Sequence, residues 1–375
     1  MKKSVGLITM HRVANHGSVL QALATQRAIE QLGHNCTIID YAYPTDEHLQ
    51  RIGLDWYPHE RDLWQLIKKT LRGRESAAIY QRLERFYWFR KKYLKTTRKS
   101  YKTNEELKED AKKWAFDVYC VGSDQVWNPK YTMDDGAFVL DFVPEGKRKI
   151  SYASSFTVGE MDDKKQREFY GDHLKTFDAI AVREQSGVAL AKQLTGKEAK
   201  HVLDPVFLLK KEEWAKTLGI EVKKEKYVLF YSLNYMADTM PEMVQFVEQV
   251  MSEQKGLSKM VSNKGIKSGY DVEVVNDDKT KVFVERIANA EMVITDSFHA
   301  SAFALLFGVP VYGFSGSKGD DRLLSLYRMM GVEERFVGKG ENKGMVNGKW
   351  NVEKIEENIA QLRTESIKYL KEAIG

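Results

Sequence analysis

The chain has 375 residues, of which 43% are hydrophobic and 30% are charged, and 58 Lys and Arg against 53 Asp and Glu give a net charge of +5. Long disordered chains combine low hydrophobicity with a large charge imbalance, so this composition excludes disorder over the whole chain. At about 150 residues per domain, the length predicts two domains.

The basic excess lies in one segment. Residues 61–102 contain 14 Lys and Arg and 3 Asp and Glu, a balance of +11, whereas the rest of the chain contains 44 and 50, a balance of −6. No recognised nucleic-acid-binding motif accompanies this segment, so we expect no nucleic-acid partner.

Two cysteines, Cys36 and Cys120, are present, which allows neither a disulfide framework nor a zinc motif. The first apolar stretch, residues 5–8, is shorter than the roughly 7 to 15 residues of a signal-peptide core, and no segment reaches the roughly 18 apolar residues of a membrane span. We therefore expect a cytoplasmic protein that contains no metal site.

The chain opens with the pattern of a βαβ unit: a strand at 5–9, a helix at 18–32 that stops at Gly33, and a strand at 36–41. The turn after the first strand lacks the G-x-G-x-x-G dinucleotide fingerprint. A basic helical insertion at about 47–102 follows, and Thr103 with Glu106 predicts a capped helix after it. Further strands are predicted at 116–121, 149–153, 179–183 and 201–203, with helices at 162–176 and 184–194.

Asp204 and Pro205 form a strong turn signal, after which the α/β rhythm repeats. Strands are predicted at 227–231, 259–262, 272–275, 292–295 and 309–314, with helices beginning at Thr239 and at 280–290, 299–307, 322–330 and 352–374. This order predicts an α/β protein in which two doubly wound Rossmann-like domains face a cleft. We place the domains at 1–207 and 208–375, with the last helix packing back on the first domain.

In open parallel sheets, ligands bind beyond the carboxyl ends of the strands. Ser297 and His299 follow the strand at 292–295 where a helix begins, and such a helix start suits a phosphate or a carboxylate. A helix cap with a structural histidine is the alternative. Arg183 ends one strand and Arg322 follows another, and the three side chains Arg183, His299 and Arg322 together would suit a small, highly anionic donor. A salt-bridged structural arginine is the alternative for Arg183, and a surface loop with solvated charges is the alternative for Arg322.

Residues 122–129 place Asp124, Gln125 and Trp127 directly after a strand. Amide and carboxylate groups beside an aromatic ring are typical of sugar recognition, whereas a tight turn with Trp127 as its packing anchor is the alternative. Asn15, after the first strand, either caps a helix or lines the same sugar-binding cleft as residues 122–129.

Taken in order, several segments resemble the polysaccharide pyruvyl transferase family: Asn15-His16-Gly17-Ser18, Gly122-Ser123-Asp124-Gln125-Val126-Trp127-Asn128-Pro129, Ser151-Tyr152-Ala153-Ser154-Ser155-Phe156, Val182-Arg183-Glu184, Leu203-Asp204-Pro205 and Thr295-Asp296-Ser297-Phe298-His299. The resemblance implies a fold like that of the GT-B glycosyltransferases, with an N-terminal acceptor domain and a C-terminal donor domain. It implies phosphoenolpyruvate as donor, a sugar of a cell-surface polysaccharide or exopolysaccharide, or of its lipid-linked precursor, as acceptor, and a pyruvate ketal as product, with no cofactor.

Under this resemblance Arg183, His299 and Arg322 match the family's donor-binding cations, and we expect Ser297 to bind the donor with them. From the chemistry of ketal formation we expect His299 and Asp124 to take part in acid/base chemistry. From their residue types and positions we expect Asn15, Gln125 and Trp127 to bind the acceptor. A glycosyltransferase that uses a nucleotide sugar and a non-catalytic glycan-binding protein are the alternatives. The basic segment 61–102 has two interpretations. It either makes peripheral contact with anionic lipid at the inner face of the membrane or forms a helix that only faces solvent.

Overall fold

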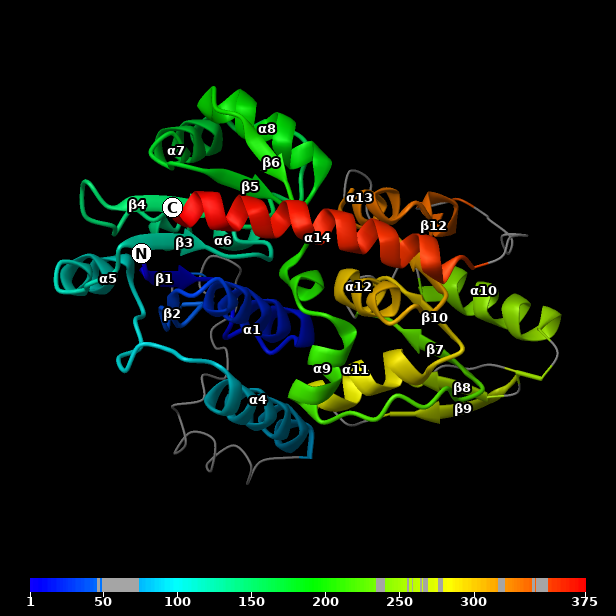
Figure 1. Cartoon of the computed structure of the whole chain (residues 1–375). Coiled ribbons are helices and arrows are strands. Elements are labelled where there is room, and N and C mark those ends of the chain that lie inside the picture. Colours follow the sequence, from blue (N-terminus) through cyan, green and yellow to red (C-terminus); the bar gives the residue numbers. More distant parts are fainter. Residues whose placement is uncertain are drawn as a thin grey trace. The chain divides into compact units, whose positions relative to one another are not determined.

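The computed structural model describes residues 1–45, 48, 74–233, 240–254, 256–257, 259–263, 265, 269–275, 279–315, 321–338, 341 and 350–375 (Figure 1). Contacts divide the chain into two compact units, which are Met1–Leu208 with Glu365–Gly375, and Leu209–Thr364. The predicted helix start at Thr239 and most of the first half of the basic insertion, including 49–73, lie outside the described residues.

The described part of unit 1 contains six short strands and the helices that connect them. The strands are β1 (Ser4–Ile8), β2 (Asn35–Ile38), β3 (Val118–Val121), β4 (Arg148–Ser151), β5 (Ile180–Val182) and β6 (Ala199–His201). The helices are α1 (His16–Gln31), α4 (Arg74–Tyr93), α5 (Asn104–Ala111), α6 (Pro129–Thr132), α7 (Lys164–Leu174) and α8 (Gln185–Thr195), with 3₁₀ turns η1 (Gly136–Val139) and η2 (Pro205–Leu208).

The strands of unit 1 run parallel in the order β2-β1-β3-β4, and β5 and β6 form a second parallel pair. Single bridges from Ile150 to Ala179 and from Ser154 to Val182 place β5 beside β4. The direction of winding reverses between β1 and β3, and such a reversal is where open α/β sheets bind ligands.

Helix α1 shows how the sequence produces this layout. The side chain of Asn15 accepts hydrogen bonds from the backbone N–H groups of Gly17 and Ser18 and so caps the helix start. Gly33, with φ of 90°, reverses the chain after the last turn, a conformation that other residues rarely adopt. The chain then enters β2 parallel to β1, as a right-handed crossover requires.

Unit 2 repeats the arrangement with a sheet of six parallel strands. These are β7 (Tyr227–Tyr231), β8 (Lys259–Ser262), β9 (Asp271–Val274), β10 (Met292–Thr295), β11 (Val311–Phe314) and β12 (Phe336–Val337), in the order β12-β11-β10-β7-β8-β9. The helices are α9 (Lys211–Leu218), α10 (Met240–Glu253), α11 (Thr280–Asn289), α12 (Phe298–Leu306) and α13 (Arg322–Met330), with a 3₁₀ turn η4 (Glu333–Arg335). The last helix, α14 (Val352–Ile374), begins in unit 2, and its residues from Glu365 onward belong to unit 1. Here the winding reverses between β7 and β10.

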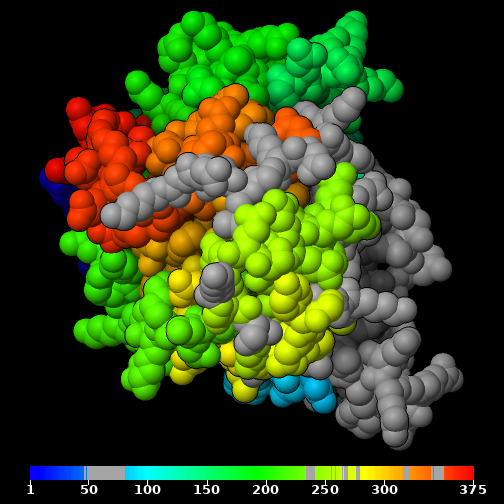
Figure 2. Space-filling model, turned by 90° about the vertical axis from the view of Figure 1, so that its right-hand side faces the viewer, coloured from blue at the N-terminus to red at the C-terminus, as the bar shows by residue number. Residues whose placement is uncertain are grey.

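Helix α10 covers one side of this second sheet. Its buried Phe246 packs its ring 4.7 Å from that of Tyr312 on β11, and Met243, Val247 and Val250 join the same core. The outer side of α10, coloured yellow-green, lies at the face shown in Figure 2. Among the described helices, none is long and apolar enough to cross a membrane.

Candidate functional site

The polar side chains of unit 1 gather beyond the carboxyl ends of β1, β3, β4, β5 and β6. Asp124, directly after β3, has a φ of 81°, in the left-handed region that residues other than glycine rarely occupy. Its Oδ2 accepts a hydrogen bond of 2.6 Å from the Ser18 hydroxyl, and its Oδ1 accepts one of 3.0 Å from the Gln125 backbone. This geometry holds the carboxylate in one orientation at the winding reversal.

Arg183, directly after β5, is almost completely buried, with 3% of its surface exposed. Its Nη1 donates to Asp204 Oδ2 at 3.0 Å, and its Nη2 lies 4.0 Å from Asp124 Oδ1. Ser123 also donates to Asp204 Oδ2, at 3.0 Å. The guanidinium charge is therefore offset by two carboxylates of its own unit, and the structure brings the predicted residues Arg183 and Asp124 together.

Gln125 belongs to the same loop cluster. Its Oε1 accepts hydrogen bonds of 2.8 Å from the Asn128 amide and 3.1 Å from the Thr157 hydroxyl. The neighbouring Glu184 accepts from the backbone N–H groups of Phe156 and Thr157, at 2.8 and 3.1 Å. These bonds fix the loops after β3, β4 and β5 to one another, which sets the shape of the sheet edge around Asp124.

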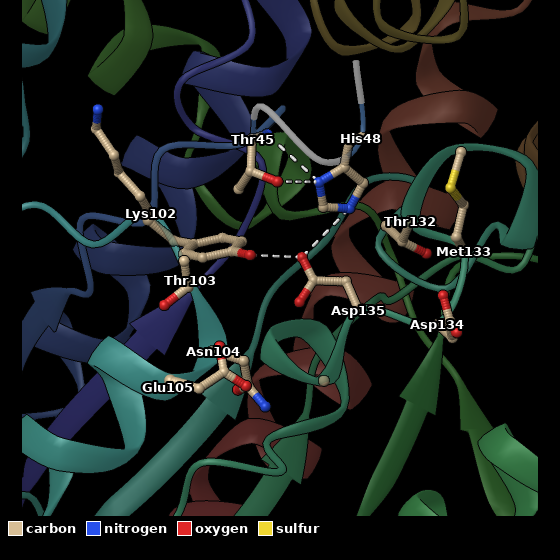
Figure 3. Close-up of a pocket in the computed structure, with 12 residues that line it drawn as sticks. Thr45, His48, Lys102, Thr103, Asn104, Glu105, Thr132, Met133, Asp134 and Asp135 are labelled. Atoms are coloured by element: carbon tan, nitrogen blue, oxygen red, sulfur yellow. Dashed lines mark hydrogen bonds and ion pairs between the residues drawn. The ribbon is translucent and has the colours of Figure 1, made fainter. Parts of the chain in front are cut away.

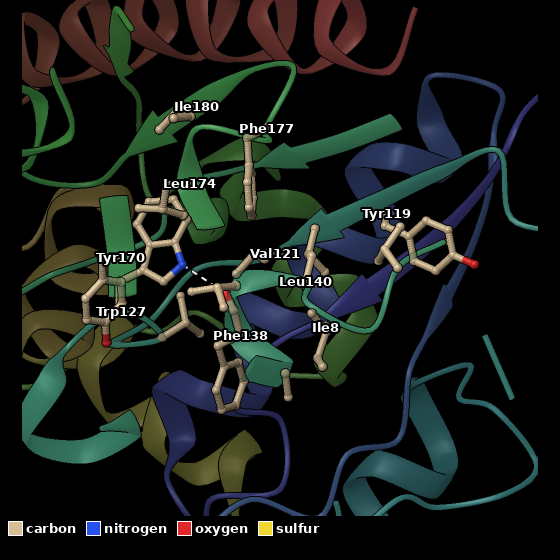
Figure 4. Close-up of a cluster of buried hydrophobic side chains, with 14 of the residues drawn as sticks. Ile8, Tyr119, Val121, Trp127, Phe138, Leu140, Tyr170, Leu174, Phe177 and Ile180 are labelled. Atoms are coloured by element: carbon tan, nitrogen blue, oxygen red, sulfur yellow. Dashed lines mark hydrogen bonds between the residues drawn. The ribbon is translucent and has the colours of Figure 1, made fainter. Parts of the chain in front are cut away.

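Trp127 does not present a ring to an acceptor, so this part of the prediction is wrong. The residue is 0% exposed, its Nε1 donates to the Phe138 carbonyl at 2.9 Å, and its rings pack against Phe177 (Figure 4). They also pack against Phe156. A large ring on a short loop gains more from the core than from the surface, and its one donor finds a backbone partner there. Asn15 is the cap of α1, as the alternative stated.

A partly buried charge cluster that the sequence analysis missed follows β1 and β2. Arg12 makes a bidentate pair with Asp40, with bonds of 2.7 and 2.6 Å, and His11 Nε2 lies 3.0 Å from Asp40 Oδ1. Burial by itself raises the pKa of Asp40, but the hydrogen bonds from His11 and Arg12 outweigh it and hold this pKa well below its usual range. The sequence around His11 and Arg12 and the sequence around Asp40 do not by themselves predict that these side chains are in contact.

A polar pocket of about 190 Å³ opens in unit 1 beside the end of β2 and the start of α5 (Figure 3). Asp135 accepts a 2.6 Å hydrogen bond from the Tyr41 hydroxyl and lies 3.3 Å from His48 Nε2. Thr45 Oγ1 in turn lies 2.7 Å from His48 Nδ1. The rest of the lining is mostly polar: Lys102, Thr103, Asn104, Glu105, Thr132, Met133, Asp134 and Gly136. Hydroxyl, amide and carboxylate groups in one hollow suit a polyhydroxylated ligand.

In unit 2, polar groups gather at the ends of β7 and β10. Asp296 accepts from the Ser232 hydroxyl at 2.9 Å and from the Leu233 backbone at 2.7 Å, so it joins the two strands across the winding reversal. Ser297 caps α12, because its hydroxyl accepts from the Ala300 backbone at 3.3 Å. Asp296 therefore holds the turn from which α12 starts.

His299 lies in the first turn of α12 and Arg322 is the first residue of α13, and each is 8% exposed. The two helices are joined by a 3.1 Å hydrogen bond between the hydroxyls of Ser301 and Tyr327. Both helices start beyond the carboxyl ends of their preceding strands, β10 and β11. Unit 2 thus places Ser297, His299 and Arg322 at one edge of its sheet, where helix starts favour anions.

Comparison with known proteins gives a family and a fold. The family model for polysaccharide pyruvyl transferase matches residues 15–318. No curated protein matches the chain.

Among solved structures, a putative UDP-N-acetylglucosamine 2-epimerase from Listeria monocytogenes has a TM-score of 0.51 and 12% identity, covering 99% of this chain and 91% of that one. UDP-GlcNAc 2-epimerase from Neisseria meningitidis bound to UDP-GlcNAc has a TM-score of 0.49 and 10% identity, covering 100% and 94%. Spinosyn rhamnosyltransferase SpnG has a TM-score of 0.41 and 10% identity, covering 99% and 95%. The first likeness concerns the fold alone and, with the parallel sheets of both units, confirms the expected GT-B-like class.

Proposed function

Because this chain belongs to the polysaccharide pyruvyl transferase family, we propose that it transfers the enolpyruvyl group of phosphoenolpyruvate to a saccharide, forms a pyruvate ketal and releases phosphate. Membership of the family makes the chain a transferase. The match over residues 15–318, which includes Asp124, Ser297 and His299 but ends before Arg322, is the observation that carries the proposal.

The donor site of this proposal is the start of α12 in unit 2. Phosphoenolpyruvate carries a phosphate and a carboxylate, so its site needs cations and oriented N–H donors. Ser297 and His299 lie at the positive end of the helix dipole, and Arg322 supplies a guanidinium at the start of α13. His299 is the proposed group that stabilises and protonates the leaving phosphate.

The acceptor side of this proposal is the edge of unit 1 around Asp124. Asp124 deprotonates or orients a sugar hydroxyl, and Ser18 and the backbone of Gln125 hold it in place. Arg183, with its two carboxylate neighbours, acts as a positioning residue for Asp124 rather than as a direct donor ligand. The pocket in Figure 3 receives the saccharide, since its hydroxyl, amide and carboxylate groups match sugar hydroxyls.

The proposed reaction joins one carbon to two oxygens. A sugar hydroxyl oxygen bonds to C2 of phosphoenolpyruvate, and one hydroxyl proton ends on the methylene carbon, which becomes a methyl group. The second hydroxyl oxygen then bonds to C2 as the C2–O bond to phosphate breaks, and the second proton leaves with the phosphate. The charge that builds up at C2 and on the phosphate is what cations at the site stabilise.

Incubation of the full chain with phosphoenolpyruvate and a panel of saccharides, including a lipid-linked diphosphate sugar, tests this proposal through phosphate release. His299→Ala is expected to abolish acceptor-dependent release, whereas His173→Ala on α7 serves as a matched control. Absence of release with every acceptor would contradict the proposal.

Thermal unfolding with phosphoenolpyruvate, UDP or GDP separates the donor classes. Phosphoenolpyruvate is expected to raise the midpoint of the wild type and not that of His299→Ala, because a ligand that binds only the native state stabilises it. A shift with UDP or GDP alone would favour the nucleotide-sugar glycosyltransferase instead. We place the reaction in the cytoplasm, at the inner face of the membrane.

A further inference from the structure

We propose that the outer side of helix α4 is a docking surface for anionic lipid headgroups. This surface, the Trp88 face, consists of Trp88, Lys91 and Lys92. Binding of lipid by this face does not require the transferase activity. Its use, which is to bring the protein to a lipid-linked acceptor, rests on the proposed function.

Helix α4 has one side in the core of unit 1 and one side at the surface. Leu83, Phe86 and Phe89 are buried, and the ring of Phe86 lies 5.1 Å from that of His16 at the start of α1. Arg82 Nη2 donates to the Ala14 carbonyl at 3.0 Å. These contacts fix the helix to unit 1, so the opposite side of α4 is not needed to hold it in place.

Trp88 lies at the centre of that opposite side and is 60% exposed. Among the described residues it is the most exposed aromatic side chain. Its Nε1 donates to Glu84, one turn earlier, at 3.3 Å. An indole whose polar edge has a partner and whose apolar ring faces outward has the amphipathic character that suits a membrane interface.

Two lysines lie one turn after Trp88 on the same side of the helix. Lys91 and Lys92 are both exposed, and their ammonium groups lie 5.6 Å from the ring of Tyr87 and 4.9 Å from that of Tyr93. Within the described part of the chain neither forms an ion pair. Their positive charge is thus available to an outside partner, while their methylene stems lie along apolar rings.

The sign of the charge favours an anionic surface as the occupant. Residues 81–102 contain nine Lys and Arg against the single acid Glu84. A polybasic segment with an exposed tryptophan is the combination that anchors peripheral proteins to anionic bilayers. The position also fits, because residues 94–102 lead from α4 past the end of β2 to Lys102 and Thr103 on the pocket of Figure 3.

Sedimentation of the full chain with vesicles tests the docking surface without any substrate. We expect binding to phosphatidylcholine vesicles that contain 30% phosphatidylglycerol (roughly the acidic-lipid content that supports electrostatic binding) and little binding to phosphatidylcholine alone. Lys91→Gln with Lys92→Gln is expected to weaken binding about 30-fold, and Trp88→Ala about tenfold. Lys164→Gln with Lys165→Gln, two adjacent exposed lysines on α7, is the control and is expected to bind like the wild type.

Failure of the wild type to bind acidic vesicles would overturn the proposal. So would a loss of binding in the lysine variant with none in Trp88→Ala, since that pattern reflects diffuse charge attraction alone, and so would equal losses in the α7 control. Trp88-dependent capture of a protein partner without vesicle binding would assign the face to that partner instead. The thermal shift with phosphoenolpyruvate, measured on the same variants, is expected to be unchanged, so failure of the donor proposal remains distinguishable.

Discussion

The guanidinium of Arg183 lies between two carboxylates that come from different loops: it donates to Asp204 at 3.0 Å and lies 4.0 Å from Asp124. All three residues are buried, with at most 8% of the residue surface exposed. The strand ends of β3, β5 and β6 are therefore tied together by charge as well as by backbone bonds. This gives Arg183 a structural role at the edge of the unit 1 sheet, as the salt-bridged alternative expected.

Arg183→Ala is expected to destabilise unit 1 strongly. Removing one partner leaves buried carboxylates without compensation, a change that costs about 3–5 kcal/mol. Urea unfolding of Arg183→Ala, Asp204→Asn and the double variant measures the coupling. A double variant whose loss equals the sum of the two single losses would show that the pair does not act as a unit.

Asp124→Asn is expected to fold and to lose activity. Asparagine tolerates the φ of 81° and keeps an oxygen that can accept from Ser18, but it cannot accept a proton from a sugar hydroxyl. We expect acceptor-dependent phosphate release to fall by about 10² to 10⁴. Asp124→Val, with a β-branched side chain at the same φ, is the matched variant that should instead lose stability in urea. Activity near that of the wild type in Asp124→Asn would remove this carboxylate from the mechanism.

Much of the fold was predictable because amphipathic helices and apolar strands carry a strong signal. The helices Arg322–Met330 and Val352–Ile374 and the strands Lys259–Ser262 and Met292–Thr295 have the bounds that the sequence predicted. Another short strand was placed less accurately. The strand predicted at 201–203 is Ala199–His201, since its pairing is set by β5 and not by its own sequence.

Trp127→Ala is expected to cost about 3–5 kcal/mol of unfolding free energy, because it leaves a large cavity beside Phe156 and Phe177. Trp127→Phe keeps most of the volume and loses the hydrogen bond to Phe138, so a loss of about 1 kcal/mol is expected. Acceptor KM of Trp127→Phe should match the wild type. A raised acceptor KM with unchanged stability would instead support a role of Trp127 in binding the acceptor.

Acid unfolding should depend on Asp40. Its folded-state pKa is held below the unfolded one, so its stabilising contribution is complete above the unfolded value near 3.8 and is lost as the pH falls through the lower folded value. Asp40→Asn removes this contribution. Between about pH 4 and pH 2 the unfolding free energy of the wild type should fall more steeply than that of the variant, by up to about 1.4 kcal/mol per pH unit. Parallel curves from urea titrations would show that Asp40 has no such effect.

The parts of the site that could not be predicted from the sequence are those built from residues far apart in the chain. Individual residues at strand ends, such as Asp124 and His299, could be selected because parallel sheets bind ligands there. The pocket joins Tyr41, His48 and Asp135 through hydrogen bonds across about 90 positions of sequence, and no local pattern relates them. The burial of Trp127 likewise depends on Phe138, Phe156 and Phe177, which a motif does not display.

The pocket itself gives the last prediction. Glu105→Gln with Asp134→Asn removes two carboxylates from its lining while keeping the volume and the fold, since both side chains are exposed. If sugar hydroxyls donate to these groups, the KM for the saccharide that supports phosphate release should rise about tenfold, because a hydrogen bond to a charged group contributes roughly 1.5–3 kcal/mol. Glu109→Gln, an exposed carboxylate further along α5 and outside the pocket, is the matched control and should leave this KM unchanged. The KM for phosphoenolpyruvate should stay constant in both variants, because the proposed donor residues belong to unit 2. If only the KM for phosphoenolpyruvate rose, the pocket would not be the site that binds the saccharide.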